Sequence, residues 1–124
     1  IRSGKEEHVL NVLDKLSGLV QSLHENNIQT SVEQLLYIPP KELNDGIKSL
    51  LKEKSTEMGF PFCSINSGAG HDAMVFSDYT EVGMLFIPSK DGLSHCPEEW
   101  SDSKHLAKAV QIFYEAAKNL TEAE

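Results

Sequence analysis

Helix-like and strand-like segments alternate along this 124-residue chain, and this alternation most limits the folds open to it. Several stretches place apolar residues three and four positions apart, which is the spacing of one helical face. Shorter apolar runs lie between them, at residues 28–37, 61–65 and 82–87, and these are typical of strands. Alternating helices and strands favour an α/β arrangement, which is the fold class that we predict.

The first helix is expected over about Gly4–His24. Its apolar face consists of Val9, Leu13, Leu16, Val20 and Leu23. Ser3 and Glu6 have the spacing of a capping box at its start. Asn26 and Asn27 favour its end, because asparagine tolerates the left-handed backbone conformation. The sequence therefore predicts a long amphipathic helix near the start of the chain.

Three further helices are expected. The second has Pro40 in its first turn and ends at Gly59, and the third spans about Ala69–Tyr79. Residues 101–103, Ser-Asp-Ser, offer capping oxygens for the last helix, whose residues 121–124 are expected to fray. The apolar face predicted for this helix consists of Leu106, Val110, Phe113, Ala117 and Leu120.

Charge and composition exclude some classes of partner. The formal net charge of −8 argues against nucleic acid and acidic membrane surfaces. No apolar run approaches the roughly 20 residues of a membrane span, and the opening residues lack the apolar region of a signal peptide. Cys63 and Cys96 form no CxxC pair, so they are free thiols of a reducing compartment or a disulfide. Cys63 is expected in the core, because a buried free cysteine behaves as a small apolar residue. We therefore expect a cytoplasmic protein that binds neither nucleic acid nor membranes.

Two glycine-containing segments are the candidate binding elements. Residues 67–73, Ser-Gly-Ala-Gly-His-Asp-Ala, form a small-residue turn that presents His71 at the mouth of a predicted helix. Gly68 and Gly70 lack Cβ atoms, so a ligand can approach the backbone closely, and amide groups at a helix start favour an anion. Gly92–His95 forms a loop after a predicted strand, where metal-binding histidines are often found. Taken alone, either histidine could also be an ordinary helix-cap or surface residue.

Longer matches connect these segments to a family. Residues 67–74 and 82–89, together with Gly92–His95 and Pro97–Glu99, resemble the metal-dependent N-carbamoyl-amino-acid hydrolases. This group includes allantoate amidohydrolase and β-ureidopropionase and belongs to the aminoacylase-like metallopeptidase superfamily. Ile1-Arg2-Ser3 resembles the end of an Asp-Ile-Arg strand of the group. The resemblance covers essentially the whole chain, and it implies the C-terminal part of such an enzyme.

The resemblance implies roles for four residues. His95 matches a metal-ligand histidine, and Gly70 and His71 match residues that contact the substrate beside the scissile amide. Arg2 matches an arginine that holds the substrate carboxylate, which a planar guanidinium can bind through two hydrogen bonds. Cys96 stands where the family usually has serine, and it is left open as an incidental thiol, a reactive group or a metal ligand.

The resemblance also implies what the reaction would need. A water activated by zinc or manganese would attack the carbamoyl carbon and break a non-peptide C–N bond of an N-carbamoyl amino acid or allantoate. In the family pattern the other metal ligands and the general-base glutamate lie upstream, and no residue of this chain matches them. We therefore expect the isolated chain to be inactive, and it is left open whether it binds metal.

Two partial domains are implied in the same way. Residues 1–38 would belong to a ferredoxin-like dimerisation (lid) domain, and residues 39–124 to the C-terminal part of a zinc-peptidase-like catalytic domain. The family pattern implies a homodimer and a small ureido-acid substrate. An alternative from another class is a non-catalytic module that dimerises through exposed apolar surface. A thiol hydrolase built on Cys96 and His95 is a weaker alternative, because adjacent loop residues rarely point at each other.

Overall fold

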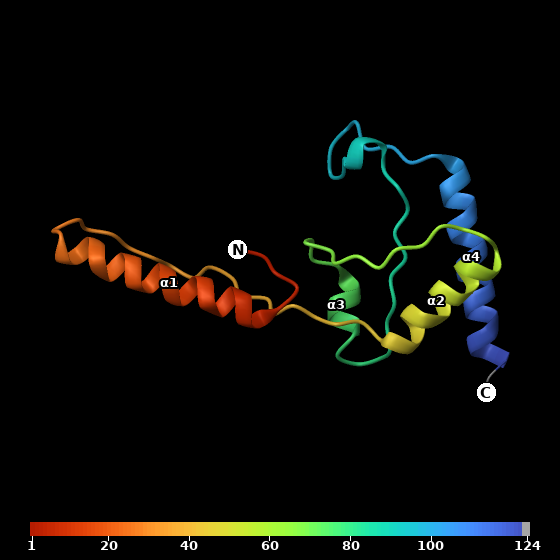
Figure 1. Ribbon diagram of the computed structural model, residues 1–124, viewed down its shortest axis with the longest axis horizontal. Coiled ribbons are helices and arrows are strands. Elements are labelled where there is room, and N and C mark those ends of the chain that lie inside the picture. Colours follow the sequence, from red (N-terminus) through yellow and green to blue (C-terminus); the bar gives the residue numbers. More distant parts are fainter. Residues whose placement is uncertain (123–124) are drawn as a thin grey trace. The chain divides into compact units, whose positions relative to one another are not determined.

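Four α-helices and one short 3-10 helix are the regular elements of residues 1–122, the part of the chain that the structure describes. Figure 1 shows this computed structural model, with helices α1 (Glu6–Glu25), α2 (Asp45–Glu57), α3 (Asp72–Phe76), η1 (Lys90–Gly92) and α4 (Ser103–Glu122). The chain divides into two compact units. Unit 1 contains Ile1–Glu42 and Ile65–Gly70, and unit 2 contains Leu43–Ser64 and the chain from His71 onward.

Unit 1 consists mainly of α1 and the chain that runs back along it (Figure 1). The Tyr37 hydroxyl donates a hydrogen bond to the Glu6 carboxylate at 2.6 Å, which ties the returning chain to the start of the helix. This bond to a carboxylate raises the pKa of Tyr37 above its usual value. At the other end Asn27 has a φ of 59°, and the Asn26 side chain donates to the Ser22 carbonyl at 2.8 Å. The predicted asparagine stop is therefore confirmed.

The predicted capping box of Ser3 and Glu6 is wrong. The helix begins at Glu6 after Lys5, and no side chain caps it. The Ser3 hydroxyl oxygen instead accepts a hydrogen bond from the Lys5 amide at 3.1 Å, one residue too early for a cap. The Glu6 carboxylate is engaged by Tyr37, not by a backbone amide. Glu6 and Glu7 still favour the helix start, because negative charge there complements the helix dipole.

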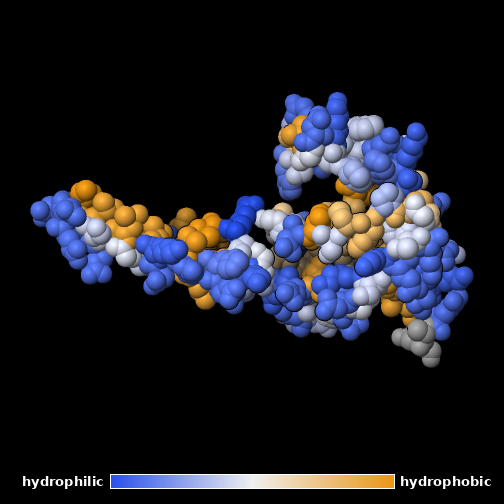
Figure 2. All heavy atoms as spheres, viewed as in Figure 1, coloured by the Kyte–Doolittle hydropathy of each residue, from blue (hydrophilic) through white to orange (hydrophobic). Residues whose placement is uncertain are grey.

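No side chain of α1 is fully buried. Its predicted apolar face is half-buried, while other large apolar side chains of unit 1 are exposed, several of them by more than half. Figure 2 shows apolar surface along this unit. The exposed side chains include Leu10, Leu19, Val32, Leu35 and Leu36. Unit 1 therefore has amphipathic elements without a closed core among the described residues.

Helix α2 begins at Asp45, and not at Pro40 as predicted, and it ends just before a glycine. The Asn44 side-chain oxygen accepts a hydrogen bond from the Ile47 amide at 2.9 Å, which makes Asn44 the N-cap. The Asn44 side-chain amide donates to the Glu81 carboxylate at 2.9 Å, and the Asn44 backbone amide donates to the Val82 carbonyl at 2.9 Å. Gly59 follows the helix with a φ of 69°, so the predicted glycine stop is confirmed. One asparagine thus starts the helix and holds the segment at 81–82 against it.

The core of unit 2 lies between α2 and α4, which lie side by side in Figure 1. Leu51 of α2 and Ile112 and Ala116 of α4 are buried in one cluster. Partly buried apolar side chains surround this cluster: Ile47, Leu50, Met58, Phe60 and Leu85. The two helices and the segment at 82–87 therefore share one small core.

The predicted apolar face of α4 is not the face that is buried. Ala109, Ile112 and Ala116 are buried, whereas the face predicted from Leu106 to Leu120 is largely exposed. Two alanines allow another helix to approach closely, and this favours their face over a bulkier one. Residues 121 and 122 are helical, contrary to the predicted fraying, and residues 123 and 124 lie outside the described residues. Among residues 1–122, no helix has the length and apolar character needed to cross a membrane.

The predicted strands are wrong for the described part of the chain. Residues 28–37, 61–65 and 82–87 contain no strand, and the third predicted helix is reduced to α3. A strand requires a neighbour that completes its backbone hydrogen bonds, and no described segment pairs with these runs. The apolar pattern reports suitability for a sheet, but it cannot supply the neighbouring strand. Residues 1–122 therefore do not display the predicted α/β layers or the lid-domain sheet.

Gly83 is required by close packing. A Cβ atom placed on Gly83 would lie 2.2 Å from the Ile47 Cγ2 methyl. We expect Gly83→Ala to destabilise unit 2 by about 1–3 kcal/mol through overpacking, measured by urea unfolding. Gly18→Ala is the control, since nothing lies within 4 Å of a Cβ there, and it should instead be stabilising by up to about 1 kcal/mol. Equal unfolding midpoints for Gly83→Ala and the parent chain would contradict the packing described.

Candidate functional site

Arg2 is held at the glycine turn of unit 1. Its Nη1 donates a hydrogen bond to the Gly68 carbonyl at 2.9 Å, across 66 residues of sequence. Gly4 also faces this segment, because a Cβ placed on it would lie 3.2 Å from the Asn66 side-chain nitrogen. The start of the chain and the turn are therefore neighbours. Arg2 is exposed, so the rest of its guanidinium can reach an anion in solvent.

The turn leaves the backbone at Gly70 open. Nothing lies within 4 Å of a Cβ placed on Gly68 or Gly70, and neither residue has a positive φ. The Ser67 hydroxyl accepts a hydrogen bond from the Ala69 amide at 3.2 Å, which shapes the turn locally. Neither crowding nor backbone conformation within the described chain requires glycine at these two positions. The backbone at Gly68 and Gly70 is therefore left uncovered by described residues where a side chain would stand.

His71 lies directly before α3 and is its N-cap residue in extended conformation, with φ −136° and ψ 149°. Its ring packs edge-on against Phe86, with the ring centroids 5.6 Å apart and the planes at 63°. The side chain is half-buried and gives no capping hydrogen bond to α3. The aromatic contact fixes the ring from one side. His71 is thus oriented by the segment at 82–87, which in turn packs on α2.

His95 lies in a closed loop between η1 and α4 (Figure 1). The Lys90 amide donates to the Trp100 carbonyl at 2.8 Å and joins the two ends of this loop. His95 has a left-handed backbone with φ 58°, which costs a non-glycine residue roughly 1–2 kcal/mol. Its amide donates to the Glu99 carboxylate at 2.7 Å. The loop therefore holds His95 in a conformation that is disfavoured in a free chain.

The described residues do not form a complete metal site around His95. The His95 side chain is exposed, and within residues 1–122 its imidazole has no hydrogen-bond or ion-pair partner. No group of three or more histidine, cysteine, aspartate or glutamate side chains in this part of the chain could hold a metal ion. A metal bound by His95 would therefore need ligands from outside these residues.

Cys63 and Cys96 are both free thiols. Cys63 is exposed and Cys96 is partly buried, so the predicted placement of Cys63 in the core is wrong. The physical reason is that residues 61–65 are exposed and have no neighbouring strand to cover them. Cys96 follows His95 directly, and its carbonyl accepts the Glu99 amide at 3.0 Å. This contact involves the Cys96 backbone and assigns no role to the thiol.

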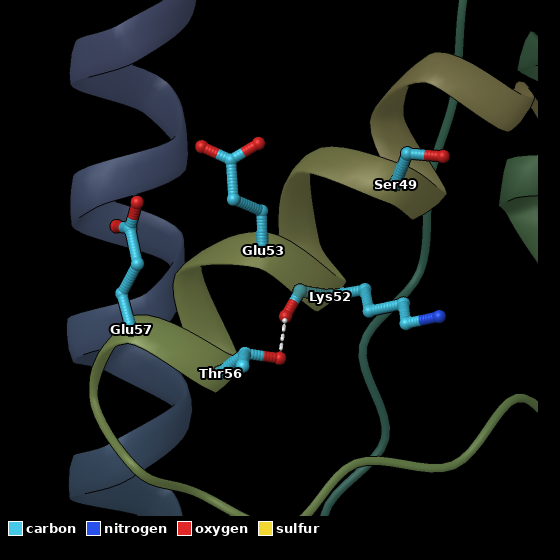
Figure 3. Close-up of a pocket in the computed structure, with 5 residues that line it drawn as sticks. All are labelled: Ser49, Lys52, Glu53, Thr56 and Glu57. Atoms are coloured by element: carbon cyan, nitrogen blue, oxygen red, sulfur yellow. Dashed lines mark hydrogen bonds between the residues drawn. The ribbon is translucent and has the colours of Figure 1, made fainter.

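A shallow depression on the outer face of α2 contains none of the predicted site residues. Figure 3 shows its lining side chains: Ser49, Lys52, Glu53, Thr56 and Glu57. The Thr56 hydroxyl donates to the Lys52 carbonyl at 2.8 Å, a bond within one helical turn. Nearby, Lys54 donates to Glu57 at 3.0 Å, and this bond raises the pKa of Lys54. These contacts are those of an ordinary polar helix face.

The candidate residues are divided between the two units. Arg2 and Gly70 belong to unit 1, and His71 and His95 belong to unit 2. Sequence analysis did not single out three groups that contact them, namely the Gly68 carbonyl, the Phe86 ring and the Glu99 carboxylate. Glu99 alone could have been found from local pattern, as an acidic residue shortly after a proline turn in a histidine-bearing loop.

Comparison with known proteins now defines the class. The model of peptidase family M20/M25/M40 matches residues 6–119, and the chain belongs to this family. The match covers the glycine turn, His71 and the loop of His95. The family resemblance inferred from the sequence is thereby confirmed.

Named relatives indicate which members of the family the chain is similar to. The chain is 32% identical over 121 residues to an N-carbamoyl-L-amino-acid amidohydrolase of Paenarthrobacter aurescens, covering 97% of this chain and 29% of that protein. It is 29% identical over 100 residues to a protein of the same name from Geobacillus stearothermophilus, covering 81% and 24%. It is 31% identical over 87 residues to an allantoate amidohydrolase of Bacillus subtilis, covering 70% and 21%. The chain spans less than a third of the length of these relatives.

Proposed function

We propose that this chain is part of a metal-dependent amidohydrolase that cleaves a non-peptide C–N bond of an N-carbamoyl amino acid or of allantoate. The supporting observation is the similarity to N-carbamoyl-L-amino-acid amidohydrolases along 97% of the chain. The chain has a net charge of −8, and the substrate carries a negatively charged carboxylate. Arg2, which lies at a turn with open backbone, supplies the local positive charge that such a carboxylate needs. The substrate class is a small ureido acid with a carboxylate.

Each site residue has a task in this proposal. Arg2 binds the substrate carboxylate, because its guanidinium is oriented by the Gly68 carbonyl and keeps further donors for an anion. The Gly70 backbone approaches the reacting amide, and His71, oriented by Phe86, donates or accepts a hydrogen bond beside it. His95 offers one imidazole nitrogen to a divalent metal, zinc or manganese. When bound, such a metal supplies an activated water or polarises the carbonyl.

The same proposal includes the larger architecture. Residues 1–38 belong to a ferredoxin-like lid domain through which the enzyme dimerises, and residues 39–124 to an α/β catalytic domain of the zinc-peptidase type. The exposed apolar side chains of unit 1 support this, because surface of this kind marks contact with other protein. The two free thiols support a cytoplasmic location.

A second candidate rests on the same exposed surface. We infer that, if the chain works without further catalytic residues, it is a non-catalytic module that associates through unit 1. Leu35 is 84% exposed and Leu36 is 75% exposed, values that are unusual for neighbouring leucines in a soluble monomer. This candidate requires a stable dimer without metal-dependent turnover. The amidohydrolase proposal requires turnover by the complete gene product.

The isolated 124-residue chain is expected to be inactive. Its described residues contain no group of three or more side chains that could hold a metal ion, and a hydrolytic metal site needs several ligands. The measurement is ammonia release from N-carbamoyl amino acids and from allantoate with added zinc or manganese. The assay is run on this chain and on the complete gene product, including any residues encoded before Ile1. Turnover by the short chain would refute the prediction, and no turnover by the complete product would refute the amidohydrolase proposal.

A further inference from the structure

Two backbone hydrogen bonds close the loop that carries His95. The Lys90 amide and the Trp100 carbonyl join its ends at 2.8 Å. Inside it, the Glu99 amide donates to the Cys96 carbonyl at 3.0 Å, which closes a tight turn with Pro97 at its second position. Proline favours that position because its fixed φ fits the turn. The loop therefore has a rigid inner turn directly after His95.

Glu99 contacts His95 from the far end of this inner turn. The Glu99 Oε2 atom accepts the His95 backbone amide at 2.7 Å, a short bond of the length expected for a charged acceptor. His95 is one of only three non-glycine residues with positive φ in residues 1–122. A left-handed histidine needs a compensating interaction, and the Glu99 carboxylate provides one. Glu99 is anchored through its own amide as well, so its side chain starts from a fixed point.

We propose that Glu99 is a positioning residue, which holds the His95 backbone in the left-handed conformation and thereby sets the direction of its imidazole. The inference rests on the proposed function in one respect, the use of that imidazole as a metal ligand. Glu99 binds the main chain of His95 and leaves both ring nitrogens without partners in the described chain. The ring thus remains available to a metal while its attachment point is fixed. Neighbouring Glu98 makes no such contact and is a matched control.

Nuclear magnetic resonance of the 124-residue chain tests the positioning directly. In Glu99→Ala the His95 amide proton should move upfield and exchange with solvent about tenfold faster, because its acceptor is lost. In Glu99→Gln the chemical shift and the exchange rate of this amide should stay close to those of the parent chain, since the side-chain oxygen still accepts the hydrogen bond. Glu98→Ala should change neither quantity. The Leu93 amide, bonded to the Lys90 carbonyl at 3.1 Å, reports whether the loop remains folded. An unchanged His95 amide in Glu99→Ala, or equal changes in Glu98→Ala, would overturn the proposal.

A second measurement separates this inference from the proposed function. In the complete gene product, Glu99→Ala should weaken binding of the metal by about 10–100-fold, while Glu99→Gln and Glu98→Ala stay near the parent value. Metal affinity is measured by competition with a chelator, without substrate. If resonance spectra follow the expected pattern but metal binding does not depend on His95, then Glu99 positions the loop and the metal role of His95 is wrong. If Glu98→Ala weakens metal binding as much as Glu99→Ala, the positioning role is refuted.

Discussion

Replacing His95 in the complete gene product is expected to reduce metal-dependent turnover by about a thousandfold or more. A bound metal contributes several kcal/mol to the barrier of such reactions, and each 1.4 kcal/mol corresponds to a factor of ten. His95→Asn is the sharper variant, because asparagine tolerates the left-handed backbone that His95 adopts at φ 58°. This variant removes the imidazole without adding backbone strain. Metal content, measured by elemental analysis, should fall together with turnover.

The matched control is His8→Ala. His8 is an exposed histidine on α1, and its contacts are with Ser3 and Glu7 of its own helix start. It should leave metal content and turnover unchanged. Full metal content and turnover in His95→Asn would exclude His95 as a ligand, and equal losses in both variants would indicate a general instability of the protein.

Local patterns predicted the C-terminal ends of α1 and α2. The ends of α1 and α2 depend on residues within one turn of the helix, and Asn27 and Gly59 adopt the positive φ values that their types favour. The capping box at Ser3 failed for a non-local reason, since Tyr37 from a distant part of unit 1 engages Glu6. The buried face of α4 failed for a similar reason. Which of its two apolar faces is covered depends on α2, and small alanines meet it.

The strands could not be settled by sequence in the same way. Residues 82–87 have a strand-like pattern, yet in the described chain this segment packs on α2 through Gly83 and Leu85 without a paired neighbour. A pairing partner is a property of the whole protein, and this chain spans 29% of its relative from Paenarthrobacter aurescens. Apolar alternation therefore indicates that a segment suits a sheet, but not whether the described chain supplies its pairing partner.

The candidate site also combines residues that a local sequence pattern reveals with contacts that it does not reveal. The glycine turn and the His95 loop are contiguous motifs, so their residues could be chosen from sequence and from family resemblance. The contact between Arg2 and the Gly68 carbonyl joins positions 66 residues apart and has no local signature. The ring of Phe86 beneath His71 has none either. Motifs thus indicate the candidate groups for ligand contact, whereas the groups that orient them become visible only after folding.

Arg2 is the only arginine in the sequence, which makes its replacement unusually specific. In the complete gene product, Arg2→Ala is expected to lower kcat/KM for a carboxylate-bearing ureido acid by about 100-fold. Two hydrogen bonds between a guanidinium and a carboxylate are together worth roughly 3 kcal/mol. The loss should fall mainly on KM, because the carboxylate is bound in both ground state and transition state. Lys5→Ala is the control, since Lys5 is a nearby exposed cation that pairs with Glu7 at 3.9 Å.

Arg2 also ties the start of the chain to the glycine turn, and this purely structural task must be separated from carboxylate binding. A substrate analogue with a neutral amide in place of the carboxylate makes the distinction. If Arg2 binds the carboxylate, the parent protein should process the analogue poorly, and Arg2→Ala should cause little further loss. If Arg2 only supports the turn, Arg2→Ala should reduce activity on both compounds by the same factor. Arg2→Lys should recover only part of the activity on the acid, because an ammonium cannot form the paired bonds of a planar guanidinium.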